Sequence, residues 1–215
     1  MDPVDCTLLC DGSSDRMLIP SIKWLLVEYF PDVPFKIEYA DIRRVLKANT
    51  TLSEKICVAL ELFPCKILFV QRDTERENFD SRLEEIQLGI ENANCKSLQQ
   101  WPHIIPVIPQ RMSEAWLLID EYAIKRASGN PNSNADVNLP KVKSLETLPD
   151  PKDTLIKLLK KATGLNNRRL RRFNPYSAIH IVAQSIEDYS PLRQLHSFSM
   201  LEKSISELEL PQLVD

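Results

Sequence analysis

The chain has 215 residues, of which 43% are hydrophobic and 27% are charged, an ordinary composition for a globular protein. Its net charge of −3 excludes a protein that is basic over its whole surface, but it is compatible with a locally basic region. No apolar run approaches the roughly 20 residues that cross a bilayer, and residues 1–5 lack a basic leader, so we expect a cytoplasmic protein with no membrane partner.

The first 127 residues alternate between strand and helix patterns. Short apolar or alternating runs predict strands at residues 4–10, 35–40, 65–70 and 103–109. Apolar residues spaced by three or four predict helices at residues 18–29, 52–63 and 79–93. This order is typical of an α/β domain with about four mostly parallel strands flanked by helices. Polar alternation in the second strand indicates a place near a sheet edge, and two prolines in the fourth indicate an edge or an irregular end.

The outer face of the helix expected at residues 79–93 carries three glutamates: Glu84, Glu85 and Glu91. We interpret them as a solvated face. The five cysteines form no C-x-x-C pair and lie apart from the histidines, so we expect buried free thiols rather than a zinc site.

The rest of the chain predicts a loop or linker at residues 128–150 and an all-helical extension at residues 151–215. Eight basic residues and one acidic residue, Asp153, lie between residues 151 and 172. Such a patch can neutralise phosphates, which favours nucleic acid as a partner. A solvated helix face and a protein-binding surface are the alternatives. The basic residues are Lys152, Lys157, Lys160, Lys161, Arg168, Arg169, Arg171 and Arg172.

Acidic residues follow three of the four expected strands. Asp73 and Glu75 come directly after the central apolar strand, and Asp11 and Asp15 follow the first strand in a turn. Glu114 comes after the fourth strand, where Ser113 is a plausible N-cap of the next helix. Because chemistry gathers at the carboxyl ends of parallel strands, we expect a divalent cation there. Solvated turn residues, and for Glu114 a favourable helix-dipole interaction, are the alternatives.

Three motifs carry a resemblance to a known family: Asp11-Gly12-Ser13-Ser14-Asp15, Arg72-Asp73-Thr74-Glu75 and Ser113-Glu114-Ala115-Trp116-Leu117-Leu118. Over residues 4–120 the chain resembles the Toprim domain, and more narrowly the small bacterial Toprim-like proteins related to the overcoming-lysogenization-defect (OLD) nucleases. Asp11 stands where Toprim proteins usually have glutamate, and Glu75 stands where they usually have aspartate. Both departures keep a charged, hard oxygen ligand.

The resemblance implies a Toprim-like domain at residues 1–127 and a metal-dependent nuclease acting on DNA or RNA, an effector in antiviral defence in bacteria. The implied ligands of Mg²⁺ or Mn²⁺ are Asp11, Asp15, Asp73, Glu75 and Glu114. Asp11, Asp73 and Glu114 would be catalytic, with Asp11 in proton transfer. The residues expected to contact nucleic acid are Arg72, Arg111, Lys160, Lys161, Arg168, Arg169, Arg171 and Arg172.

An alternative interpretation is a non-catalytic or partner-activated module. The chain has four glycines and no G-x-x-x-x-G-K-[ST] motif, so it is not itself a P-loop ATPase. Proteins that it resembles are often fused to an ATPase or encoded with one. The resemblance therefore implies a separate ATPase subunit as a partner, and a homo-oligomer is a further expectation.

Overall fold

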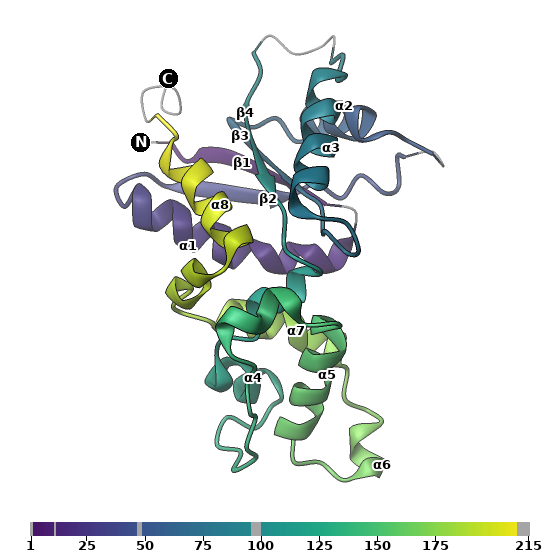
Figure 1. Ribbon diagram of the computed structural model, residues 1–215, viewed down its shortest axis with the longest axis vertical. Helices are drawn as coiled ribbons and strands as arrows, with labels where there is room; N and C mark the ends of the chain where they lie inside the picture. The colour runs from purple at the N-terminus through teal and green to yellow at the C-terminus, as the bar shows by residue number, and fades with distance from the viewer. Residues whose placement is uncertain (1, 11, 47–48, 96–99, 210–215) are drawn as a thin grey trace.

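The computed structural model of this chain describes residues 2–10, 12–46, 49–95 and 100–209. The sheet and its flanking helices form one part of the molecule, and a cluster of helices extends from it (Figure 1). The fold therefore combines an α/β body with a helical extension, as the sequence predicts.

Four parallel strands form a single sheet in the order β2-β1-β3-β4. Their bounds are β1 (Val4–Leu9), β2 (Phe35–Tyr39), β3 (Ile67–Gln71) and β4 (His103–Val107). The sequence-based strand positions are confirmed, and so is the placement of the second and fourth strands at the edges. The chain adds β2 on one side of β1 and then β3 on the other, so the winding direction reverses between β1 and β3.

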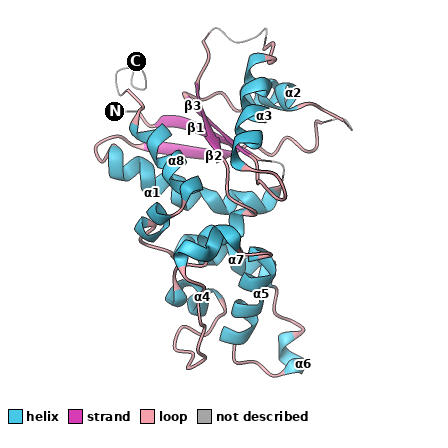
Figure 2. Ribbon diagram, in the orientation of Figure 1, coloured by secondary structure: helices cyan, strands magenta, loops and turns pink. Residues whose placement is uncertain are grey.

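Side chains of the central strand β3 point alternately to the two faces of the sheet, and all five of its residues are buried. Ile67 and Phe69 belong to the core that includes α1 (Ile19–Tyr29) and α8 (His196–Ser206). Leu68 and Val70 belong to the core beneath α2 (Leu52–Leu62) and α3 (Phe79–Glu91). Helices thus cover both faces of the sheet (Figure 2), which explains why β3 is a continuous apolar run.

All regular elements within residues 108–209 are helices. They are the α-helices α4 (Glu121–Ala127), α5 (Pro151–Ala162), α6 (Asn167–Leu170), α7 (Pro175–Ser185) and α8, and the short 3-10 helices η2 (Ser113–Leu117), η3 (Val142–Thr147) and η4 (Ser190–Gln194). The last of them, α8, returns from the helical part to lie beside α1 against the sheet (Figure 1). No helix among the described residues has the length and apolar character needed to span a membrane.

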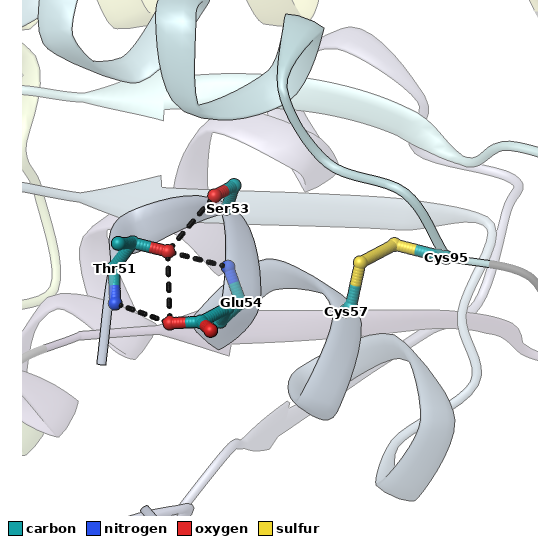
Figure 3. The surroundings of a disulfide bond; sticks show 5 residues. All are labelled: Thr51, Ser53, Glu54, Cys57 and Cys95. Carbon is teal, nitrogen blue, oxygen red and sulfur yellow. Dashed lines mark hydrogen bonds between the residues drawn. A yellow bond between two sulfur atoms is a disulfide. The ribbon is translucent and has the colours of Figure 1, made fainter. Parts of the chain in front are cut away.

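A disulfide joins Cys57 of α2 to Cys95, four residues after α3 ends (Figure 3). The expectation of free thiols is therefore wrong for these two cysteines, whereas Cys6, Cys10 and Cys65 are free. The two partners are 38 residues apart in sequence and meet because α2 and α3 pack together on one face of the sheet. Sequence spacing alone does not reveal such a pairing.

The start of α2 is fixed by a capping box, drawn beside the disulfide in Figure 3. The Thr51 hydroxyl accepts a hydrogen bond from the Glu54 backbone N–H at 3.3 Å, and the Glu54 carboxylate accepts one from the Thr51 N–H at 2.7 Å. The two bonds satisfy donors that the first helical turn leaves without backbone partners. This local arrangement fixes where α2 begins and thereby where it presents Cys57.

Candidate active site

A cavity of about 310 Å³ lies at the carboxyl ends of β1 and β3, where the winding of the sheet reverses. Open α/β sheets bind their ligands at this point, because the loops from neighbouring strands diverge there. The lining combines acids, cations and polar groups: Ser14, Asp15, Gln71, Arg72, Asp73, Glu75, Arg82, Met112, Glu114 and Lys152. We refer to it as the carboxylate cavity.

Asp15 reaches the cavity from the 3-10 helix η1 (Ser13–Leu18), which follows β1. Its carboxylate accepts a hydrogen bond from the Gly12 backbone N–H at 3.3 Å, which anchors the first turn. Burial, followed by the negative charge of Glu114, raises the pKa of Asp15 to about 6. The neighbouring acids thus hold Asp15 in an environment that disfavours its charged form.

Asp73 lies two residues beyond β3, and two side chains fix its carboxylate. Its Oδ1 accepts hydrogen bonds from the Gln71 amide at 2.8 Å and from the Ser113 hydroxyl at 2.9 Å. Burial, followed by the charge of Asp15, raises the pKa of Asp73 to about 7; Glu114 adds to the rise, and the bonds from Ser113 oppose it. Asp73 is thus oriented by its neighbours and poised to exchange a proton near neutral pH.

Glu114 enters the cavity from the first turn of η2, as the sequence predicts for its position, and is only 3% exposed. One carboxylate oxygen lies 2.9 Å from the ammonium of Lys152, in the first turn of α5. The expectation that Ser113 caps this helix is wrong. Met112 occupies the cap position, and the Ser113 hydroxyl bonds to Asp73 instead.

Glu85, on α3, forms ion pairs with two arginines, Arg72 and Arg82. Arg72 Nη2 lies 2.8 Å from one carboxylate oxygen of Glu85, and Arg82 Nη1 lies 2.6 Å from the other. Arg82 also donates through Nε to the Asp73 backbone carbonyl at 3.0 Å. The interpretation of Glu85 as part of a purely solvated face is therefore wrong. Its charge holds two cations that line the cavity.

Glu75 and Arg111 form the rim of this region, and both have left-handed backbones with φ of 52° and 68°. The Glu75 N–H donates to the Arg111 carbonyl at 3.0 Å, and the Arg111 N–H donates to the Thr74 hydroxyl at 2.7 Å. Glu75 is exposed and lines the carboxylate cavity. Arg111 is exposed too, but it is not among the residues that line the cavity.

The residues of the helical extension that the sequence predicts to contact nucleic acid lie at the opposite end of α5 and beyond it. A depression of about 350 Å³, which we call the arginine depression, is lined by Asn166, Arg168, Arg169 and Arg172. A neighbouring one of about 340 Å³ is lined by Lys160, Asn167, Leu170 and Arg171. Lys161 is exposed nearby in sequence. Helix α5 joins the two regions, because Lys152 and Lys160 are eight residues apart, or about 12 Å along its axis.

The structure brings together five of the residues expected to form the site: Asp15, Arg72, Asp73, Glu75 and Glu114. Asp11, expected as a ligand and a catalytic residue, lies outside the described residues. Sequence reasoning did not assign Lys152, Arg82, Gln71 or the Ser113 hydroxyl to the site. The sequence shows that Lys152 lies at the start of a basic helix, which hints at a functional role. Only the tertiary fold shows that this end of the helix lies beside Glu114.

Across the described residues, no three or more His, Cys, Asp or Glu side chains form a group that could hold a metal ion as they stand. Burial, and after it the mutual repulsion of the acids, nevertheless raises the pKa values of Asp15 and Asp73. Lys152 forms a direct ion pair with Glu114 of this cluster. Chemically, the arrangement can attract a divalent cation or a group that carries a proton.

Comparison with known proteins gives no further guide: no family model, no curated protein and no solved structure matches this chain.

Proposed function

We propose that this chain is a Toprim-type nuclease that hydrolyses phosphodiester bonds in DNA or RNA with the help of Mg²⁺ or Mn²⁺. The observation that carries the proposal is that Asp15, Asp73 and Glu114, from three separate strand ends, line one cavity. Cationic side chains line the same cavity: Arg72, Arg82 and Lys152. Phosphoryl transfer needs acids for a metal ion and cations for the phosphoryl oxygens, and this cavity offers both.

The donor set suits a hard divalent cation. Mg²⁺ and Mn²⁺ prefer carboxylate oxygens, and a cation would offset the burial and the charge repulsion that together raise the pKa of Asp73. Such an ion, when bound, supplies an activated water and offsets charge on the phosphoryl group. We assign its binding to Asp15, Asp73 and Glu114, with Glu75 at the rim and Asp11 as a further ligand outside the described residues.

The remaining residues orient the acids and meet the substrate. The Gln71 amide and the Ser113 hydroxyl fix one oxygen of Asp73, so its other oxygen faces a defined direction. Lys152 approaches from α5 and can pass from Glu114 to a phosphate oxygen once a cation neutralises Glu114. Arg72, already held by Glu85, can contact the adjoining phosphate.

The test is cleavage of plasmid, linear duplex, single-stranded DNA and RNA, with Mg²⁺ and with Mn²⁺, by the wild-type protein and by Asp73→Ala. We expect the variant to lose activity by roughly a hundredfold or more. Asp32→Ala is the matched control, since Asp32 is exposed in a turn after α1 and does not line the cavity. Unchanged cleavage by Asp73→Ala would overturn the site assignment.

One observation favours a second candidate function. The chain would then be a module that works with a partner, such as a separate ATPase, and that either becomes active only with this partner or has no catalytic activity of its own. Lys152 is paired with Glu114, and the described acids do not form a ready metal-binding group. A partner that shifts α5 would separate the pair and open the cluster. Cleavage that appears only when a co-purified or co-expressed ATPase is added would support this candidate. Full activity of the isolated chain would rule it out.

A further inference from the structure

Tyr176 presents an exposed aromatic ring close to the carboxylate cavity. It lies in the first turn of α7 and is 61% exposed. Helix α7 packs against both α5 and η1, the elements that supply Lys152 and Asp15 to the cavity. Tyr176 lies close enough to the Lys152 ammonium to interact with it electrostatically.

The next turn of α7 lies beside η1. His180 is four residues after Tyr176 and therefore lies on the same side of the helix. It shares a small cavity of about 130 Å³ with Arg16, the residue that follows Asp15. The face of α7 that carries Tyr176 and His180 is therefore next to η1, the element that supplies Asp15.

Tyr176 also follows the arginine depression closely in sequence. Arg172, which lines that depression, is four residues before Tyr176, so their backbones are at most about 14 Å apart. Tyr176 therefore lies near Lys152 of the carboxylate cavity and, backbone to backbone, within about 14 Å of Arg172 of the arginine depression. This combination of positive charge and aromatic surface is the pattern by which proteins hold single-stranded nucleic acid.

We propose that the substrate is single-stranded, that Tyr176 stacks on one of its bases beside the carboxylate cavity, and that the arginine depression holds its phosphates further along. This inference rests on the proposed function and deepens it. A single strand is favoured because the faces of its bases are accessible, so the Tyr176 ring can stack on one of them. Bases inside a duplex already stack on one another. Lone exposed aromatic residues are common on surfaces, so the test must separate stacking from mere exposure.

Binding is measured by fluorescence anisotropy in EDTA, at one fixed salt concentration, with labelled strands of about 12 nucleotides. The probes are oligothymidylate, oligouridylate, an abasic strand with the same backbone, and a duplex of equal length. We expect the wild-type protein to prefer the strands that carry bases, and Tyr176→Ala to weaken their binding by roughly 5- to 150-fold while leaving the abasic strand unaffected. Tyr176→Phe should retain the preference. The two base-bearing strands distinguish DNA from RNA.

Two controls separate the roles. Tyr122→Ala removes a tyrosine of similar exposure, 58%, from α4, and should change nothing. Arg169→Ala should weaken binding to the base-bearing and abasic strands by the same factor, because it removes a phosphate contact. A base preference that survives in Tyr176→Ala, or wild-type binding that is as tight for duplex as for single strands, overturns the inference. Since EDTA prevents metal-dependent cleavage, these outcomes are independent of the Asp73→Ala cleavage test of the proposed function.

Discussion

The hydroxyl of Ser113 donates a hydrogen bond of 2.9 Å to the carboxylate of Asp73, across 40 positions of sequence. The bond joins the first residue of η2 to the loop after β3, so the two strand ends that supply Glu114 and Asp73 are fixed relative to each other. Gln71 donates to both members of the pair, to Asp73 at 2.8 Å and to Ser113 at 3.3 Å. The orientation of the central acid thus depends on a shared network.

Removing the Ser113 hydroxyl should impair the site without unfolding the protein. Because the bond from this hydroxyl lowers the pKa of Asp73, Ser113→Ala should raise that pKa and shift the acidic limb of the pH–rate profile to higher pH. We expect a loss of cleavage of about tenfold to a hundredfold, as for other residues that orient metal ligands. A pH–rate profile identical to that of the wild type would contradict the assigned role. A thermal melt of the variant serves as the control for folding.

The raised pKa values of Asp73 and Asp15 predict that the protein loses stability as pH rises in the absence of metal. Folded carboxyls titrate near 7 and 6, and an ordinary aspartate titrates near 3.8. Between about pH 4 and pH 8 these two carboxyls therefore bind more protons in the folded chain than in the unfolded chain, so their contribution to the free energy of unfolding falls with rising pH. In EDTA, Tm should fall over this range, and Asp73→Asn should flatten the dependence. Added Mg²⁺ should also flatten the dependence of Tm on pH. If Tm falls with pH as steeply in Asp73→Asn as in the wild type, the prediction is refuted.

The Lys152 pair should matter more to stability than a surface ion pair. Glu114 is 3% exposed, so Lys152→Met leaves a buried carboxylate without its cation, which should cost about 1–3 kcal/mol at neutral pH. Lys157→Met is the matched control on the same helix, because Lys157 and its partner Asp153 are both exposed, and it should cost less than about 0.5 kcal/mol. Urea denaturation compares them. Equal effects of the two substitutions would disprove the argument.

Reduction of the Cys57–Cys95 disulfide should destabilise the sheet face that α2 and α3 cover. The bridge closes a loop of 38 residues, and loop-closure entropy assigns it about 4 kcal/mol. We expect the double variant Cys57→Ser/Cys95→Ser to have a lower urea midpoint than the wild type. A reductant should lower the midpoint of the wild type but not that of the double variant. Thiol titration of the unfolded, unreduced wild type should give three free cysteines. Five free thiols would show that the bridge is absent in solution.

Local sequence patterns were sufficient to predict the strands and most helices. Residues 67–70 are apolar without interruption because both faces of β3 are buried, and residues 35–39 alternate because β2 lies at an edge. Neither inference needed knowledge of distant residues. The grouping of Asp15, Asp73 and Glu114 was predictable for the same reason, since the carboxyl ends of parallel strands share one edge.

Features that depend on distant pairing were not predictable from the sequence. Serine is a common N-cap residue, yet the Ser113 hydroxyl donates its hydrogen bond to Asp73, which is distant in sequence. Glu85 follows the pattern of a solvated helix face, but Arg72, in the loop after β3, forms an ion pair with it. Cys57 and Cys95 have no characteristic spacing, and Lys152 meets Glu114 only because α5 packs against η2. Each case is a side chain whose partner lies beyond its own element.

The two edges of the sheet are poorly suited to pairing with a second copy of the chain. On β2, the exposed Lys36 and Glu38 place charges along the strand. On β4, the His103 N–H and the Val107 carbonyl bond toward β3, so the backbone of Pro106 faces outward and offers no N–H donor. Charged residues and proline at open edges are known to oppose aggregation through strand addition. Any assembly of this protein should therefore form through its helices, leaving the sheet at four strands.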